Sequence, residues 1–209
     1  MTKQEIISLL TENFYERFAE QTANIIIRSE STRALFELLE DAILFCGSKR
    51  ECNETFRNTN YLISISKEEL RKVEFRAAYV MECIYFSEIK EFAPYYNRFF
   101  KIFPFVSNES VKRHFTKIMA DILSKGRYQT DQTDYEAIAT SCIDWIINKK
   151  VRVAVQIWAI ECLFILQYRV EWVRDILEEI LQSLSVNPSP AMIVRLRRDQ
   201  MKNQVGKDS

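Results

Sequence analysis

The sequence predicts an all-α fold, and two observations support this prediction. Glycine and proline, which punctuate the turns between strands, are scarce: the 209 residues include 3 glycines and 4 prolines. Apolar residues recur at intervals of three and four along most of the chain, which is the spacing of one helix face. With 47% apolar and 28% charged residues the composition is that of a globular protein, so residues 1–209 are expected to form a single domain.

The first 47 residues are predicted to form helices that cap one end of the domain. One helix is expected at residues 3–18, with Ile6, Leu10 and Phe14 on the same side. A second is expected at residues 31–45, where Gly47 follows as a stop signal. Residues 48–65 are mostly polar and are predicted to be a long connection with room for a short helical piece.

From residue 66 onward the predicted helices follow one another in pairs. Ser66 and Glu69 fit a capping box that opens a helix ending near Phe86. Its partner is expected at residues 89–103, before Pro104. Later helices are expected at residues 108–126, 135–147, 149–167 and 170–184, with a last helix opened by Ser189 and Pro190 and a tail at residues 205–209.

Three of the predicted helices carry an acid in a matching apolar frame. The strings YVMECI, IMADIL and WAIECL align, which places acids 39 and 40 residues apart: Glu82, Asp121 and Glu161. Apolar neighbours on the same helix face imply that these carboxylates are partly desolvated and need partners. Catalysis requires one constellation rather than three similar ones, so we interpret the acids as recurring structural contacts and expect no catalytic residue.

A period near 40 with two helices per unit resembles the HEAT and armadillo repeats. The resemblance rests on VEFRAAYVMECI, VKRHFTKIMADIL and VRVAVQIWAIECL and covers about residues 66–204. It implies a right-handed α-α superhelix, or solenoid, of about three helix pairs, with N-terminal helices before them and a C-terminal capping helix. It also implies a concave wall that holds a partner, and it implies no particular reaction.

The function expected from these features is that of a non-enzymatic protein-interaction module. Two stretches are candidates for binding: the aromatic-rich residues 91–105 and the basic residues 192–207. Phe100 falls outside the apolar stripe of the first stretch, which leaves aromatic surface available for a partner. The candidate contact residues are Tyr96, Phe100, Arg195, Arg197 and Arg198.

Two alternatives remain open. One is a nucleic-acid-binding protein similar to the HEAT-like alkylpurine DNA glycosylases, which line their concavity with basic residues. The chain has 29 basic and 29 acidic residues, and the presumed concave helices carry many acids, so nucleic acid is an unlikely partner. The other is a helical enzyme that uses Glu82 or Glu161. The only histidine, His114, is expected at the surface or at a helix cap.

The cysteines and the N-terminus predict a cytoplasmic protein. The five cysteines are odd in number and form no CxxC pair, which favours thiols in a reducing compartment. No signal peptide is recognisable, and the most apolar stretch, residues 153–168, is too short to cross a bilayer. No membrane association, metal or cofactor is expected, and the oligomeric state is left undetermined.

Overall fold

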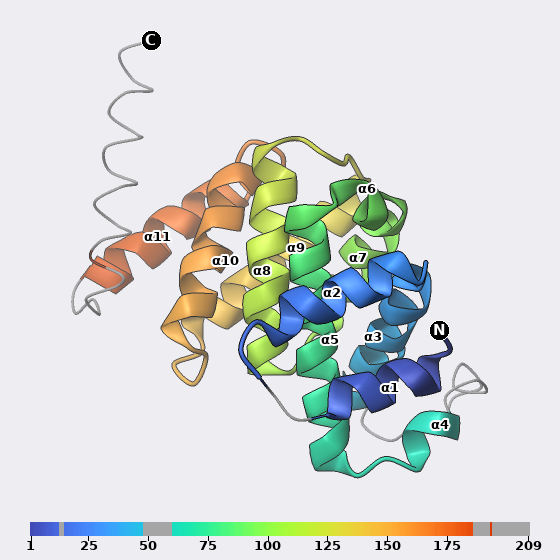
Figure 1. Cartoon of the computed structure of the whole chain (residues 1–209). Coiled ribbons are helices and arrows are strands. Elements are labelled where there is room, and N and C mark those ends of the chain that lie inside the picture. The colour runs from blue at the N-terminus through green and yellow to red at the C-terminus, as the bar shows by residue number, and fades with distance from the viewer. Residues whose placement is uncertain (13–14, 48–59, 186–192, 194–209) are drawn as a thin grey trace. The chain divides into compact units, whose positions relative to one another are not determined.

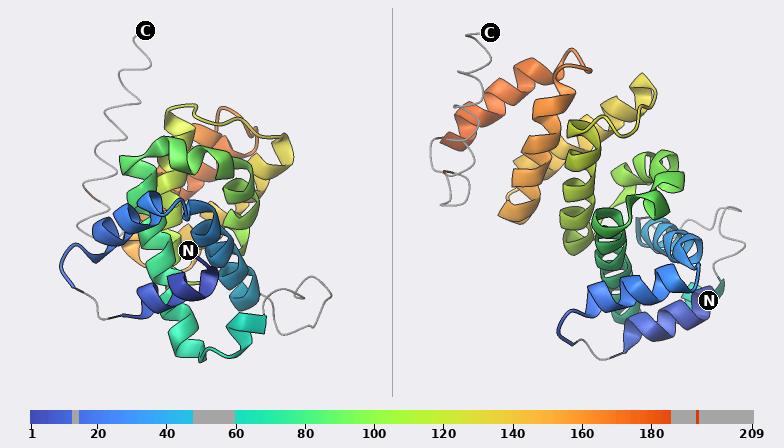
Figure 2. Two further views of the ribbon diagram at one scale, coloured as in Figure 1. Left: turned by 45° about the vertical axis from the view of Figure 1, so that its right-hand side comes forward. Right: turned by 45° about the horizontal axis from the view of Figure 1, so that its top comes forward.

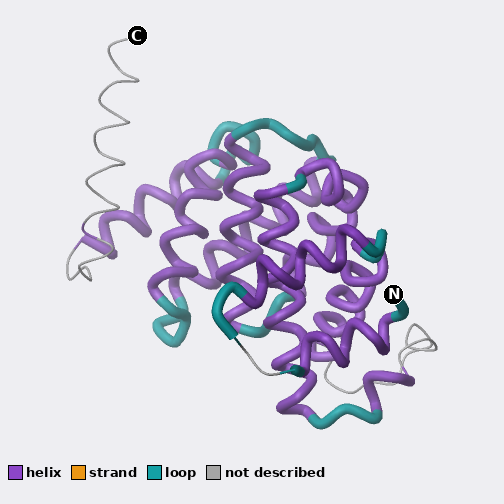
Figure 3. Tube along the Cα trace, viewed as in Figure 1, coloured by secondary structure: helices purple, strands orange, loops and turns teal. Residues whose placement is uncertain are grey.

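The computed structural model describes residues 1–12, 15–47, 60–185 and 193. All regular elements in these ranges are helices, without a strand among them, which confirms the all-α prediction (Figure 3). No helix in the described ranges has the length and apolar character needed to cross a membrane. Most of the predicted connection at residues 48–65 lies outside the described residues, and so does the predicted last helix apart from Ile193.

The chain divides into two compact units, Met1–Ile118 and Met119–Ser209. Unit 1 is built around α5 (Lys67–Ser87), which packs against α1 (Lys3–Thr11), α2 (Phe18–Arg28) and α3 (Thr32–Gly47) (Figures 1 and 2). α5 begins where predicted, because the Ser66 hydroxyl accepts the backbone N–H of Glu69 and satisfies one of the unpaired N–H groups of the first turn.

The helix predicted at residues 3–18 is wrong, because α1 ends at Thr11 and α2 begins at Phe18. Arg76 of α5 is buried there and donates hydrogen bonds to the carbonyls of Leu10 and Glu12, at 2.7 and 2.5 Å. These carbonyls lack helical partners at the end of α1, so the guanidinium group caps the helix from outside. Its Cζ also lies 5.1 Å from the centroid of the Phe18 ring.

The helix predicted at residues 89–103 is interrupted. It consists of α6 (Ile89–Phe92), a 3-10 turn at Ala93–Tyr95, α7 (Tyr96–Ile102) and a second 3-10 turn at Phe103–Phe105. Pro94 lacks a backbone N–H and cannot continue an α-helix, so the apolar face is redirected after it. As a result Phe100, expected outside the core, is 1% exposed, and Tyr96 is 8% exposed.

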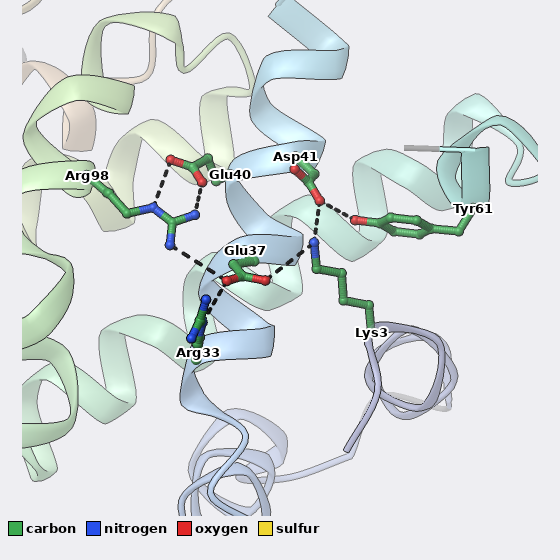
Figure 4. A network of polar contacts seen from close by, with 7 residues as sticks. All are labelled: Lys3, Arg33, Glu37, Glu40, Asp41, Tyr61 and Arg98. Atoms are coloured by element: carbon green, nitrogen blue, oxygen red, sulfur yellow. Dashed lines mark hydrogen bonds and ion pairs between the residues drawn. The ribbon is translucent and has the colours of Figure 1, made fainter. Parts of the chain in front are cut away.

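A polar network holds four helices of unit 1 together (Figure 4). Asp41 of α3 accepts from Lys3 Nζ of α1 at 2.7 Å and from the Tyr61 hydroxyl of α4 (Asn60–Ile63) at 2.5 Å. Burial and the neighbouring Asp41 carboxylate raise the pKa of Tyr61. The ion pairs of the remaining members connect α3 to α7. These members are Arg33, Glu37 and Glu40 of α3 and Arg98 of α7.

Unit 2 contains an antiparallel pair, α9 (Gln132–Ile147) and α10 (Val153–Leu166), with α11 (Val173–Ser185) packed on α10. The Gln132 amide at the start of α9 donates to the Arg169 carbonyl just after α10. The Gln156 amide near the start of α10 donates to the Ile146 carbonyl at the end of α9. These contacts fix the antiparallel arrangement, and the helices predicted at 135–147, 149–167 and 170–184 are confirmed within four residues at each end.

α8 (Glu109–Ser124) contains the boundary between the units, and both of its ends follow the sequence signals. The Asn108 Oδ1 atom accepts the N–H of Ser110 at its start. At its end Gly126 adopts a left-handed φ of 57°, and the N–H of Arg127 reaches the Ile122 carbonyl at 3.0 Å. A left-handed residue after the last turn is what this type of helix ending requires, and glycine adopts it without strain.

Candidate functional site

The first recurring acid, Glu82, lies at the centre of an acid–imidazole cluster in unit 1, formed by Glu82, His114 and Lys117. Glu82 belongs to α5 and its two partners belong to α8. His114 Nδ1 lies 2.5 Å from Glu82 Oε2, and Lys117 Nζ lies 2.5 Å from Glu82 Oε1. Glu82 and His114 are both buried. The expectation that His114 is a surface or cap residue is therefore wrong.

The partners of Glu82 favour its charged form. Burial alone raises the pKa of the carboxyl group, but the hydrogen bonds and charges of His114 and Lys117 outweigh it, so the pKa of Glu82 is lowered. A carboxylate with both oxygens engaged satisfies the requirement that a buried charge be paired. The cluster thus acts chemically as a partly buried ion pair that ties α5 to α8.

Aromatic rings surround the cluster. The Tyr79 ring stacks on the His114 ring with centroids 5.0 Å apart, and Phe75 lies 5.7 Å from the same imidazole. Lys117 Nζ lies 4.8 Å from the centroid of Phe86, which is exposed. These rings fix the orientation of the imidazole, and the exposed Phe86 marks where the cluster meets the surface.

The other two recurring acids lie in different surroundings. Asp121 in unit 2 pairs with Lys125 at 2.6 Å and with Arg127 at 3.1 Å, both within six residues of it in the chain. Glu161 is half-buried on α10. Glu82 therefore joins two helices, whereas Asp121 pairs within its own helix and the turn that follows it.

Two exposed aromatic residues lie in unit 2, on what we call the aromatic turn, residues 167–172 between α10 and α11. Tyr168 is 75% exposed and Trp172 is 36% exposed. Exposed tyrosine and tryptophan side chains provide large apolar contact areas and lose little conformational entropy when they are immobilised. Arg169 lies between them in the sequence and its side chain is also exposed.

The aromatic turn is held in place by contacts with its neighbours. Val170 is fully buried, and its N–H donates to the Leu166 carbonyl at 2.8 Å. The Arg169 carbonyl accepts from Gln132 at 3.2 Å, and the Arg169 guanidinium lies 5.2 Å from the Tyr135 ring centroid. These contacts hold the backbone of the turn that carries the two exposed rings.

The candidate contact residues named from the sequence are found neither in the Glu82 cluster nor in the aromatic turn. Tyr96 and Phe100 lie in the core of unit 1, while Arg195, Arg197 and Arg198 lie outside the described residues. The described cysteines are thiols: Cys46, Cys83, Cys142 and Cys162. The described ranges contain no group of three or more His, Cys, Asp or Glu side chains that could hold a metal ion.

Sequence reasoning identified Glu82 but missed Tyr168 and Trp172. The signal for Tyr168 was present, because it lies between the helices predicted at residues 149–167 and 170–184 and such residues are expected at the surface, whereas Trp172 fell inside the second predicted helix. His114 and Lys117 lie 32 and 35 residues from Glu82, and no local pattern connects them to it. Comparisons of the chain with protein-family models, with curated proteins and with solved structures found no match.

Proposed function

We propose that this chain is a non-enzymatic helical protein-interaction module that contacts its partner through the aromatic turn. The observation that carries the proposal is the exposure of Tyr168 and Trp172 on a turn that is otherwise anchored. Tryptophan, tyrosine and arginine are the residue types enriched at binding hot spots, and Arg169 adds the third type. A positioned turn loses less entropy on binding than a loose loop would.

The charge around the turn favours a protein partner over nucleic acid. Glu171 precedes Trp172, and Asp175, Glu178 and Glu179 are exposed on α11. A track for phosphates requires basic groups, whereas a polar rim of mixed charge around aromatic residues is typical of protein interfaces.

Capture from cells of the source organism tests the role of the turn. The wild-type chain is compared with a Tyr168→Ala/Trp172→Ala variant and with an Ile63→Ala control, which removes an exposed apolar side chain from unit 1. A partner recovered by the wild type and by the control, but not by the double variant, is then purified. The expected calorimetric result is at least a tenfold loss of affinity for the double variant. Equal affinity for all three chains would reject the aromatic turn as the contact surface.

A DNA-binding assay distinguishes the proposed protein-interaction function from the main alternative, nucleic-acid binding. Fluorescence anisotropy with duplex and single-stranded DNA is expected to show weak or no binding near physiological salt. Submicromolar affinity that is lost on changing Arg197 and Arg198 to alanine would instead favour the nucleic-acid-binding function. Electrostatic binding of that kind falls steeply with added salt, so the titration is repeated at two salt concentrations.

The repeat architecture and the cellular location belong to the same proposal. The antiparallel pair of α9 and α10, with α11 packed on α10, and the acid spacings of 39 and 40 support a HEAT-like superhelix. The thiols of the described cysteines support a reducing, cytoplasmic location. An experimental structure of the whole chain tests the superhelix, and imaging of a tagged chain in its own cells tests the location.

A further inference from the structure

A second buried carboxyl group, Glu74, connects three helices of unit 1. It lies on α5 and is fully buried. Its Oε2 atom accepts the Nδ2–H of Asn108 at 3.0 Å, while Asn108 Oδ1 accepts the N–H of Ser110 in the first turn of α8. The same amide lies 3.4 Å from the Arg71 carbonyl. Through Asn108, the start of α8 is therefore attached to α5.

Besides Asn108, the described residues offer this carboxyl group no hydrogen-bond donor stronger than a thiol. Glu74 Oε1 is buried and accepts no hydrogen bond in the part of the chain that the structure describes. The thiol of Cys46, in the last turn of α3, interacts with the carboxyl group, but a thiol is a weak donor. The C-terminal end of a helix also carries partial negative charge, which disfavours an anion beside it. The site is thus suited to a neutral carboxyl group.

The charged groups around Glu74 do little to stabilise its ionised form. Arg71 on the same helix is the cation that acts on Glu74, and its side chain is exposed. At the start of α8, Lys112 is paired with Glu109 at 2.6 Å and so is engaged elsewhere. No described group on α1, α2 or α6, the other helices packed on α5, shifts the pKa of Glu74. Burial raises the pKa of Glu74 to about 7, against the opposing effects of Asn108, Arg71 and Cys46.

We propose that Glu74 is a proton-sensitive joint: its protonated form holds α5, the end of α3 and the start of α8 together, and its ionised form loosens them. The protonated group places no charge in the core and keeps its bond to Asn108. Loss of the proton to solvent leaves a buried carboxylate with one oxygen unbonded, which is costly unless that oxygen reaches water. Water reaches it when the start of α8 moves away from α5.

Hydrogen–deuterium exchange of the intact chain tests this joint. Protection of the amides of residues 109–113 is measured at pH 6 and pH 8.5 and corrected for the intrinsic exchange rate. In the wild type we expect protection there to fall at least fivefold on going to pH 8.5, while the amides of α11 in unit 2 keep theirs. Equal protection at both pH values would overturn the proposal.

Two variants separate the joint from other effects of pH. Glu74→Gln keeps the shape of the protonated acid and cannot ionise, so protection of residues 109–113 is expected to be the same at both pH values. Asn108→Ala removes the connection itself and is expected to lower protection at both. A fivefold fall that persists in a folded Glu74→Gln chain would refute the role of Glu74. Should that variant not fold, Asn108→Ala decides the question, because a fivefold fall between the two pH values that persists without Asn108 would refute the connection through it.

Discussion

At the scale of single residues, α5 buries two carboxyl groups whose titrations shift in opposite directions. Glu82 receives hydrogen bonds from His114 and Lys117, and its pKa is lowered. Glu74 receives one from the neutral amide of Asn108, and its pKa is raised to about 7. Both groups are desolvated, so the difference lies in whether a partner can carry positive charge.

The pairing of Glu82 predicts a large effect of removing it. Glu82→Ala leaves the Lys117 ammonium group without its carboxylate and breaks the link to His114. Loss of one partner from a buried pair costs about 3–5 kcal/mol, and partial exposure of Lys117 puts the expected loss at the lower end, about 3 kcal/mol. Urea unfolding followed by circular dichroism measures it.

Glu178→Ala is the matched control, because Glu178 is an exposed acid within α11. Exposed positions of this kind usually change stability by less than about 0.5 kcal/mol. Equal unfolding midpoints for Glu82→Ala and Glu178→Ala would show that the cluster contributes nothing to stability, and the enzymatic alternative for Glu82 would then gain support.

The exposure of Tyr168 predicts that removing its side chain has little effect on stability. Tyr168→Ala is expected to change the unfolding free energy by less than about 0.5 kcal/mol, because the ring contacts mostly solvent. Tyr135→Ala removes a buried ring from the same end of unit 2 and is expected to cost about 3 kcal/mol. A large loss of stability in Tyr168→Ala would mean that the side chain supports the fold rather than a partner.

At the scale of elements, local signals predicted the helices well where the chain itself provided their ends. Ser66 and Gly126 act within a few residues of their own position, and α5 begins and α8 ends beside them. The error at residues 89–103 came from a local feature, Pro94, whereas the error at residues 3–18 came where a distant contact decided the outcome. Arg76 ends α1 from across unit 1, over a separation of 64 to 66 residues, which no sequence window contains.

The network of Figure 4 predicts how strongly α3 and α7 are tied together. Arg98 and Arg33 both contact Glu37, but Arg98 also binds both oxygens of Glu40 and is 39% exposed, against 79% for Arg33. Two-point binding of a carboxylate is stronger than a single exposed contact. Arg98→Ala is therefore expected to cost about 1 kcal/mol and Arg33→Ala less than about 0.5 kcal/mol, and the Arg98 effect should shrink in high salt. Equal losses measured by urea unfolding would contradict this ranking.

At the scale of the whole molecule, the regular spacing of the acids did not predict their contacts. Glu82 was correctly expected to be desolvated and paired, yet its partners lie on another helix and were not foreseen. Asp121 occupies the matching position and pairs with residues that follow it in the chain. Spacing reflects where a side chain lies on its own helix, while its partner depends on packing.

The two buried acids together predict how the stability of the protein depends on pH. The folded-state pKa of Glu82 lies below its ordinary value of 4.5, so its contribution is present above about pH 4.5 and is lost as the pH falls further. The folded-state pKa of Glu74 lies above 4.5, so the folded state binds the extra proton in the window from about pH 4.5 to about pH 7. Its effect is to lower the unfolding free energy as the pH rises through that window, by at most about 3 kcal/mol.

Melting temperatures measured between pH 3 and pH 9 should therefore be highest near pH 5. A change of 1 kcal/mol moves the midpoint of a protein of this size by roughly 2–4 °C, so a decline of several degrees is expected between pH 5 and pH 8. Glu74→Gln should remove most of that decline and keep the loss below pH 4.5, whereas Glu82→Gln should weaken the loss on the acid side. A wild-type midpoint that rises steadily from pH 5 to pH 8 would contradict the opposite shifts of these acids, because only a group that binds its proton more tightly in the folded state makes stability fall with rising pH.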